Sequence, residues 1–468
     1  MNIAVQDAGS FRDPAGQVFL IDEEIIRAIT PRAVDRFLHV DATGFMKDLV
    51  RQQRLVDYRD ISSAKQCAAV DGSAMLLSHP RIPFISYPYE WSFALLKSAA
   101  LHHLDLQLDA LEHGLKLVDA TAYNVQFIGA RPIFIDHLSF DTYVEDEIWQ
   151  AHHQFCMQFL NPLIIWSKVG IAPNAWFRGS LEGISPEDTA KILPFGQRFS
   201  RIPLMHVFLQ AAMQRRSLAN AQASASKTAQ TARLSRQGFR NILADLRAYI
   251  ARLEPPNGRT VWRDYAANTS YAGDEARIKS AFVHRMISSV RAQTVIDLGC
   301  NSGDYSVVAL DAGAQRVIGF DFDHGALEQA YARATAKNLD FLPLWLDAAN
   351  PSPNQGWAQA ERKGLSARAN ADTIIALAVL HHLVIGRNIP MDMAIHWIVS
   401  LAPQGIIEFP HKGDPMVQTL LAQRQDIFDS YCEDAFISSL ERHACIVERE
   451  VVIEGSRTLF WYRRHPAA

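Results

Sequence analysis

The residue pattern with the clearest chemical meaning is a turn that follows a short apolar run. The segment Val295–Ser306 has the sequence VIDLGCNSGDYS, so an apolar run passes into a turn that contains Gly299 and Gly303. Glycine lets the backbone turn tightly and approach a ligand that a larger side chain would displace. The pattern predicts a strand, a ligand-binding turn and a helix in succession.

A second carboxylate follows this turn at a spacing of about 20 residues. Asp321 directly follows the next apolar run, Arg316–Phe320. A carboxylate at that place can accept hydrogen bonds from both hydroxyls of a ribose, so the cofactor is expected to carry a nucleoside. A dinucleotide would favour a third glycine, but Asn301 occupies the middle position, which weakens a phosphate-binding interpretation.

The chain from about Arg259 to its end resembles the class I methyltransferases, because Asp297, Gly299 and Gly303 match their acidic-x-Gly-x-x-x-Gly motif. The resemblance implies a Rossmann-like fold and S-adenosylmethionine, a cofactor without phosphate. It assigns the ribose to Asp321 and the adenine to Asp347. The residues that it places at the cofactor are Asp297, Gly299, Cys300, Asn301, Gly303, Asp321, Phe322, Asp347, Ala348 and Leu377. A Rossmann-like domain without a cofactor is the alternative.

Two adjacent histidines, His381 and His382, are the candidate catalytic residues. They follow the run Thr373–Ala378, which resembles the family's fourth strand and the loop over the sulfonium. Imidazole titrates near neutral pH, so either ring could orient an acceptor or remove its proton. They could equally cap the loop, since methyl transfer to a good nucleophile depends on in-line positioning more than on acid–base help.

Three polar residues follow the fifth apolar run and are predicted to contact the methyl acceptor. Glu408, His411 and Lys412 would lie at the carboxyl edge of the sheet, where open α/β sheets bind ligands. A solvated loop is the alternative. The segments DLGCNSG, LAVLHHL and EFPHKGDPMV also resemble a bacterial group that includes nodulation-type methyltransferases, and this resemblance implies a link to cell-surface or signalling glycans.

The N-terminal half contains a different set of polar residues, Asp119, Asn124 and Asp136. Their spacing resembles the catalytic and metal-binding loops of kinase-like phosphotransferases, in which an Asp orients the acceptor hydroxyl and an Asn and a second Asp hold magnesium. Leu117–Val118 and His137–Leu138 depart from that family's His-Arg and Phe-Gly, and no phosphate-binding lysine or glycine-rich loop is apparent. The alternative is turn and cap hydrogen bonds in an acceptor-recognition domain.

No metal site is predicted from the histidines and cysteines. The pairs His102–His103 and His152–His153 show no carboxylate or cysteine partner at ligand spacing, and adjacent residues on a helix point to different faces. The five cysteines are scattered and odd in number, which fits a reducing cytoplasm.

The elements that would position these residues alternate between apolar runs and helix-compatible segments. Runs at 295–298, 316–320, 339–346, 373–378 and 405–408 predict an α/β fold with a doubly wound, mostly parallel, Rossmann-like sheet. An antiparallel hairpin at 445–453 and 458–462 closes it. Many members of the methyltransferase family carry a lid before the first strand, and the residues that fall there are Trp262, Tyr265, Tyr271 and Lys279, with core packing as the alternative.

The length of 468 residues predicts two or three domains. Residues 1–216 form an N-terminal α+β domain, and residues 259–468 form the methyltransferase domain. Between them, 217–258 is a linker and connecting helix, because the stretch from Ser217 to Ser235 is small and polar and a helical apolar spacing resumes at Phe239.

Composition restricts the partners and the location. The formal net charge is −4, with 46 basic and 50 acidic residues, so the chain offers no global field for a nucleic acid. No apolar run approaches the roughly 20 residues of a membrane span, and the N-terminus lacks a signal-peptide pattern. The sequence predicts a cytoplasmic methyltransferase for a small-molecule or glycan acceptor. The alternatives are a bifunctional kinase–methyltransferase and a non-catalytic scaffold or sensor that binds S-adenosylmethionine.

Overall fold

The computed structural model describes residues 5–21, 24–63, 72–219, 233–256, 272–422 and 424–466. The chain divides into two compact units. The first comprises Met1–Phe127, Arg131–Asn257 and Asn354–Arg362, and the second comprises Ile128–Ala130, Gly258–Pro353 and Lys363–Ala468. The aromatic residues of the predicted lid, Trp262, Tyr265 and Tyr271, and the linker segments 220–232 and 257–258 lie outside the described residues.

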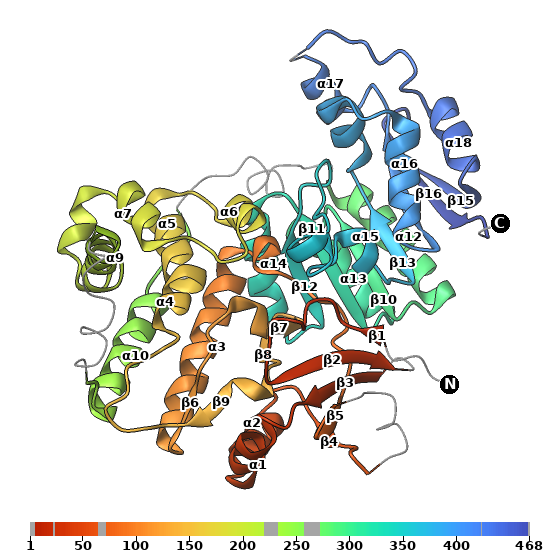
Figure 1. Ribbon diagram of the computed structural model, residues 1–468. Coiled ribbons are helices and arrows are strands. Elements are labelled where there is room, and N and C mark those ends of the chain that lie inside the picture. Colours follow the sequence, from red (N-terminus) through yellow and green to blue (C-terminus); the bar gives the residue numbers. More distant parts are fainter. Residues whose placement is uncertain are drawn as a thin grey trace. The chain divides into compact units, whose positions relative to one another are not determined.

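The second unit is built on a seven-stranded sheet with the order β12-β11-β10-β13-β14-β16-β15 (Figure 1). Its first five strands in this order run parallel, as predicted. The strands are β10 (Thr294–Leu298), β11 (Arg316–Asp321), β12 (Phe341–Trp345), β13 (Thr373–Ala376), β14 (Gln404–Pro410), β15 (Ala444–Ile453) and β16 (Arg457–Arg464).

The central strand β10 is the point at which the strand order changes direction. β10 is buried at every position after Thr294, and its neighbours are β11 on one side and β13 on the other. The chain order therefore reverses at β10, which is the switch point at which open α/β sheets bind ligands beyond the carboxyl ends of the strands. Asp297 lies opposite Gly319 of β11 and Ile375 of β13.

Helices pack against the parallel strands. Phe282 of α12, Ala309 of α13 and Leu327 of α14 belong to one apolar cluster, and α16 packs with α18. The helices of this unit are α12 (Ala272–Val290), α13 (Asp304–Asp311), α14 (His324–Ala336), α15 (Leu365–Arg368), α16 (Met391–Ser400), α17 (Pro415–Leu421) and α18 (Glu433–Glu441). The last two strands pair antiparallel with each other, and β16 pairs antiparallel with β14.

The first unit contains a five-stranded antiparallel sheet with the order β1-β2-β3-β5-β4. Its strands are β1 (Val5–Gln6), β2 (Gly16–Ile21), β3 (Glu24–Ile29), β4 (Arg59–Asp60) and β5 (Met75–His79). Two further pairs join β6 (Leu115–Leu117) to β9 (Phe140–Thr142) and β7 (Val125–Ile128) to β8 (Arg131–Phe134). The α-helices of this unit are α1 (Val34–Ala42), α2 (Phe45–Arg51), α3 (Phe93–Glu112), α4 (His152–Phe155), α5 (Asn161–Val169), α6 (Asn174–Gly179), α7 (Pro186–Ile192), α8 (Arg201–Pro203), α9 (Leu209–Ala219) and α10 (Arg236–Ala251).

Two capped helices pack together inside the first unit. The hydroxyl of Ser92 accepts a hydrogen bond from Leu95 N at the start of α3, and Ser235 accepts one from Gly238 N at the start of α10. α10, which the sequence predicts as a connecting helix, packs along α3 and belongs to the first unit. Among the described residues no helix is both long and apolar enough to cross a membrane.

Candidate functional site

The turn after β10 requires glycine at two positions. Gly299 has φ +78° and Gly303 has φ +82°, a backbone conformation that other residues rarely adopt. A Cβ at Gly299 would lie 2.6 Å from Val379 Cγ2, and one at Gly303 would lie 2.4 Å from the ring of Phe341. The turn is therefore packed tightly between the chain after β13 and the strand β12.

The backbone amides of this turn already have partners inside the protein. The N–H groups of Gly299 and Cys300 both donate to Phe320 O, at 2.8 and 3.0 Å. The N–H of Asn301 donates to Asp321 Oδ2 at 2.8 Å. A dinucleotide fold instead presents free N–H groups to a pyrophosphate. The turn fits a cofactor without phosphate.

The first residue of α13 supports the same conclusion. Asp304 accepts hydrogen bonds from Ser302 Oγ at 2.8 Å and from Arg333 at 2.6 Å. A carboxylate at a helix N-terminus is stabilised by the helix dipole and occupies the place where an anionic ligand would bind. This helix start is therefore unsuited to a phosphate.

Two carboxylates line the carboxyl end of the central strands. Asp297 is buried and accepts a hydrogen bond from Ser306 Oγ at 2.6 Å, and burial raises the pKa of its carboxyl to about 7. Asp321 accepts Asn301 N on one oxygen and Asp323 N on the other, both at 2.8 Å. Burial also raises the pKa of Asp321. Each Asp321 oxygen keeps a lone pair with which a ribose hydroxyl can pair.

An aromatic group lies beside Asp321, at the ends of β11 and β12. Trp345 Nε1 donates to Phe322 O at 3.0 Å, and the ring of His324 stacks on Trp345 with centroids 5.8 Å apart. The side chain of Phe322 is 57% exposed. Trp345 and His324 were not predicted from the sequence, although Trp345 ends the strand β12.

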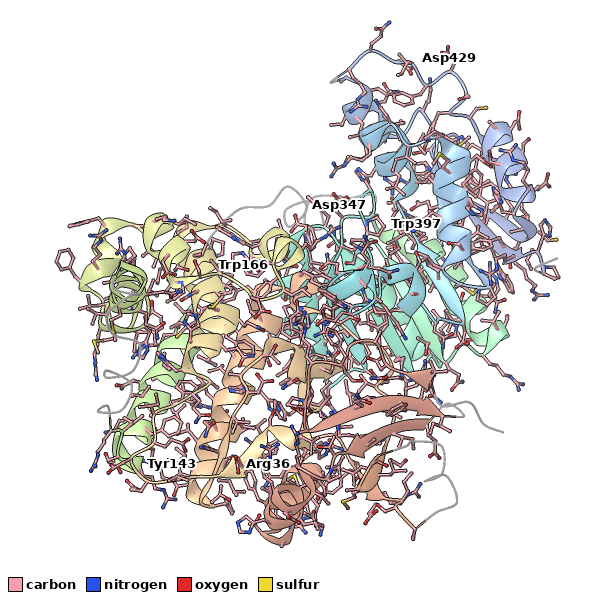
Figure 2. The ribbon with its side chains drawn as sticks, viewed as in Figure 1. Arg36, Tyr143, Trp166, Asp347, Trp397 and Asp429 are labelled. Carbon is pink, nitrogen blue, oxygen red and sulfur yellow. The ribbon has the colours of Figure 1, made fainter. Side chains whose placement is uncertain are left out.

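The other predicted cofactor residues lie at this edge of the sheet. Asp347, labelled in Figure 2, follows β12 and accepts Ala349 N at 3.0 Å, with Arg387 3.3 Å from its second oxygen. Ala348 is half-buried beside it, and Leu377 is buried directly after β13. The cofactor roles of all these residues stay predictions.

The candidate catalytic histidines are close together and largely buried. The ring centroids of His381 and His382 are 4.0 Å apart. Burial lowers the pKa of His381 well below its usual range and lowers that of His382 to about 4. Among the described residues, neither ring nitrogen of His381 has a hydrogen-bond partner. Both rings are therefore neutral at pH 7, and their lowered pKa values make them weak general bases.

Glu408, a predicted acceptor residue, belongs to a buried network of charges. Lys279 Nζ lies 2.7 Å from Glu408 Oε1 and 2.6 Å from Glu275. Arg457 pairs with Asp414 at 2.7 Å, with Glu275 at 3.1 Å and with Glu408 at 3.6 Å. Glu408 and Asp414 raise the pKa of Arg457 although burial opposes its charge. Lys279, which the sequence places in the lid region, is a buried partner of Glu408. Arg457, the second cation near Glu408, was not predicted.

His411 and Lys412, the other residues predicted to contact the methyl acceptor, have partners outside the Glu408 network. His411 Nε2 lies 3.0 Å from Thr458 Oγ1 and 3.1 Å from Glu433. Lys412 pairs with Asp426 at 2.9 Å. These contacts do not bring the two side chains to Glu408, so an acceptor role for the three as one group stays a prediction.

In the first unit, the three kinase-like residues do come together. Asn124 Nδ2 donates to Asp119 Oδ2 at 3.1 Å and to Asp136 Oδ2 at 3.3 Å. Burial and the nearby Asp136 raise the pKa of Asp119. Arg27 of β3 donates to Asp136 Oδ1 at 2.7 Å. Arg27 was not predicted, because a kinase-like site is expected to use a lysine at the phosphates.

The prediction that His152 has no cysteine partner is wrong. Cys156 Sγ lies 3.6 Å from His152 Nε2, because residues four apart share a helix face. His206 also contacts His152.

This chain is similar to one known protein over nearly its full length, and to a methyltransferase family over part of the second unit. The nodulation protein NoeA of Rhizobium meliloti (strain 1021) is 44% identical over 467 residues, which are 98% of this chain and 96% of NoeA. A family model described as ribosomal protein L11 methyltransferase (PrmA) matches residues 283–378. The ribosomal protein L11 methyltransferase of Colwellia psychrerythraea is 45% identical over 60 residues, 13% of this chain and 20% of that protein.

Among solved structures, the N-methyltransferase NodS from Bradyrhizobium japonicum WM9 in complex with S-adenosyl-L-homocysteine matches with a TM-score of 0.31 and 15% identity. The match covers 43% of this chain and 96% of NodS.

Proposed function

Because the chain belongs to the family of the nodulation protein NoeA and is an S-adenosylmethionine-dependent methyltransferase, we propose that it methylates a small molecule or a glycan. S-adenosylmethionine supplies an electrophilic methyl group on a sulfonium, which a nucleophilic oxygen or nitrogen of the acceptor takes while the sulfur keeps the bonding electrons. The chain's own residues have to bind the cofactor and hold the acceptor in line.

The observation that carries this proposal is the contact between the glycine turn and Asp321. The backbone N–H groups of the turn donate hydrogen bonds within the protein. Asp321 accepts hydrogen bonds from Asn301 N and Asp323 N, and each of its oxygens keeps a free lone pair. In the proposed complex Asp321 accepts the ribose hydroxyls and Asp347 faces the adenine. Asp297, Gly299, Cys300, Asn301 and Gly303 surround the methionine part, and Phe322, Ala348 and Leu377 complete the site.

We assign His381 a positioning role toward the acceptor. Its buried ring is neutral and lacks a hydrogen-bond partner among the described residues, so an acceptor hydroxyl or amine would supply one. A low pKa favours hydrogen bonding over proton abstraction. His382 stays a candidate for the same role. Glu408, His411 and Lys412 stay candidate acceptor contacts.

The acceptor class is supported by the charge of the chain. The net charge of −4 provides no general attraction for a nucleic acid. The name of the relative NoeA ties that protein to nodulation, which supports a small signalling acceptor. We propose that residues 1–216, with α10 packed on α3, recognise the acceptor, that the rest of 217–258 connects, and that 259–468 transfer the methyl group. Cytoplasmic location stays a prediction of the sequence.

The first test is calorimetric titration of the full chain with S-adenosylhomocysteine. We expect Asp321→Ala to weaken binding at least about tenfold, which is about 1.4 kcal/mol. Asp311→Ala, which removes an exposed carboxylate at the end of α13, is the matched control and should bind like the wild type. Equal binding by all three chains would contradict the assignment of Asp321.

The acceptor is then tested by the release of S-adenosylhomocysteine with panels of small molecules, glycans and proteins. Turnover with a small hydroxyl or amine compound or with a glycan supports the proposal. Turnover confined to a protein acceptor contradicts it, and binding without turnover on any panel favours a scaffold or sensor.

A second candidate activity is phosphotransfer in the first unit. The observation that favours it is the convergence of Asp119, Asn124 and Asp136 with the cation Arg27. The Arg27–Asp136 ion pair occupies a carboxylate oxygen that magnesium would need. Titration with ATP and magnesium decides the matter: binding that Asp136→Ala abolishes supports a bifunctional enzyme, and a flat titration rejects it.

A further inference from the structure

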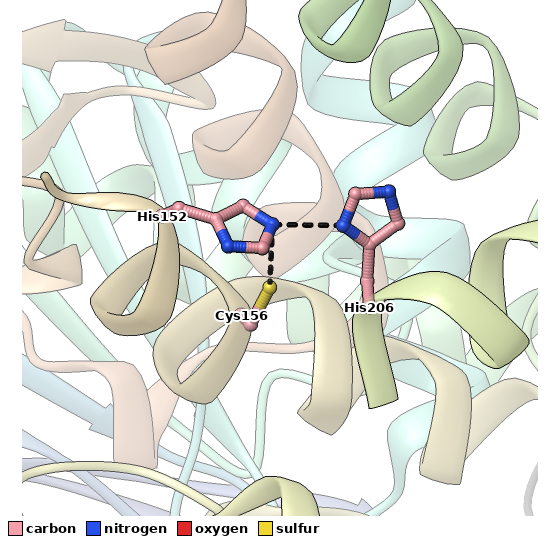
Figure 3. A group of neighbouring side chains, drawn as sticks. All are labelled: His152, Cys156 and His206. Carbon is pink, nitrogen blue, oxygen red and sulfur yellow. Dashed lines mark hydrogen bonds between the residues drawn. The ribbon is translucent and has the colours of Figure 1, made fainter. Parts of the chain in front are cut away.

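Three side chains of metal-ligating type meet in the first unit. His152 opens α4, Cys156 opens a π-helical segment (Cys156–Leu160), and His206 lies in a second one (Leu204–Phe208). Figure 3 shows the two rings and the thiol pointing toward one another. Their ligand atoms all lie within 4.8 Å of one another.

The local backbone is unusual at two of the three residues. π-Helical turns are rare and frequently occur at functional sites, because the wider turn redirects side chains. Here two separate π-helical segments present Cys156 and His206 to the same ring. The two π-helical segments bring a thiol and an imidazole to one point, which indicates a role in ligand binding in addition to helix packing.

The distances fit a tetrahedral metal ion. Nitrogen and sulfur ligands about 2.0–2.3 Å from a tetrahedral zinc ion lie roughly 3.3–3.6 Å apart. His152 Nε2 is 3.6 Å from Cys156 Sγ and 2.8 Å from His206 Nδ1. The first separation already matches, and the second is a hydrogen bond that would lengthen by about half an ångström when a metal replaces its proton.

The thiol of Cys156 is fully buried. A divalent ion that binds it displaces the thiol proton and turns the group into a thiolate ligand, with one proton released.

A fourth side chain can orient the first ligand. Gln210, one helical turn after His206, donates its amide N–H to His152 Nδ1 at 2.7 Å. When His152 binds a metal through Nε2, its Nδ1 carries the proton and needs an acceptor. If the side-chain amide of Gln210 flips, its oxygen takes the place of its NH2 group and can accept the Nδ1 proton of His152. The backbone does not have to move.

We propose that His152, Cys156 and His206 bind a zinc ion, with Gln210 as the hydrogen-bond partner of His152. Two imidazoles and a thiolate favour zinc over magnesium or calcium, which prefer oxygen ligands. Three protein ligands leave one tetrahedral position for a water molecule. Because His152 and His206 are far apart in the sequence, the ion would join α4 and its π-helical extension to the segment that leads into α9.

The experiment uses the full chain, stripped with a chelator and reduced with a phosphine. Zinc is titrated against a chromophoric chelator, and cobalt(II) is added separately to look for a thiolate-to-metal charge-transfer band. We expect one equivalent of zinc and a cobalt band in the wild type. Cys156→Ser and His206→Ala should abolish the cobalt band or weaken zinc binding at least about a hundredfold, about 2.7 kcal/mol.

The control is His153→Ala, which removes the exposed histidine next to His152 and should bind zinc like the wild type. Gln210→Ala keeps all three ligands and should weaken binding about 10–100-fold. A wild type that binds no zinc and shows no cobalt band would overturn the proposal. So would zinc binding that the Cys156 and His206 variants retain in full. The Gln210→Ala variant, which keeps all three ligands, still tests the assignment if a ligand variant does not fold.

Discussion

Single residues in the glycine turn determine whether the cofactor site can form. Gly303 combines a positive φ with a hypothetical Cβ 2.4 Å from the fully buried Phe341, whereas Gly313 has φ +106° and no atom within 4 Å of its Cβ position. We expect Gly313→Ala to cost about 1–2 kcal/mol from backbone strain alone. Gly303→Ala should cost about 1–3 kcal/mol more, because the buried ring cannot move aside. Urea unfolding of both variants measures this difference, and equal midpoints would refute the packing argument.

The pH dependence of stability can be tested at His103. This ring is fully buried between Phe155 and Phe159, and burial lowers its pKa to about 3. The unfolded chain binds a proton near pH 6.5, so unfolding is favoured as the pH falls from about 6.5 toward 3. This single group should remove about 2 kcal/mol of stability between pH 7.5 and pH 5.

His103→Leu removes the group and keeps a buried apolar side chain. We therefore expect the loss of stability between pH 7.5 and pH 5 to be about 2 kcal/mol smaller in the variant. The comparison of two pH values within each chain cancels any packing cost of the substitution. Identical pH dependence in the two chains would show that His103 does not titrate on unfolding.

The sequence predicts some site residues and misses others for identifiable reasons. Asp321 can be found because the turn-to-carboxylate spacing is local and the strand between them is apolar. Arg457 cannot be found in this way, because Glu408 lies on the neighbouring strand β14 and Glu275 on the helix α12, and only the tertiary fold brings the three together. The contact between His206 and His152 could not be predicted either, because the two residues are far apart in the sequence. The contact between Cys156 and His152 could have been predicted, because residues four apart share a helix face.

At the scale of elements, the charged network holds α12, β14 and β16 together. Glu408→Ala should cost about 3–5 kcal/mol, because it leaves Lys279 buried with one carboxylate partner fewer. The double variant Lys279→Met/Glu408→Leu removes both charges and should be less destabilised than Glu408→Ala. Chemical unfolding measures both. A double variant that is less stable than the single one would contradict this explanation, because the loss of a partner would then not be what destabilises buried Lys279.

The strands of the parallel sheet were predictable as elements because each is a short apolar run between turn residues. β10, β11, β12, β13 and β14 fall within a few residues of the predicted runs. The first unit was harder, since its sheet is built from short strands such as β1 and β4 whose pairing is long-range. Strand pairing over such distances depends on packing that local patterns do not encode.

At the scale of the molecule, ligands should act on the unit that binds them. S-adenosylhomocysteine at about 100 times its Kd should stabilise the second unit by about 2.7 kcal/mol. Hydrogen exchange should therefore slow in β10, β11 and β13 and stay unchanged in α3. Protection of equal size in α3 would show that the two units unfold as one.

The two compact units are not consecutive lengths of chain. The segment Asn354–Arg362 lies between β12 and β13 in the sequence but belongs to the first unit. There Glu361 pairs with Arg12 at 2.7 Å, and Arg362 lies over the ring of Tyr123. A polypeptide that ends at Pro256 would lack that segment. A gene breakpoint between the two halves would therefore separate residues of one compact unit from each other. Recombination that moved either half alone would carry an incomplete unit.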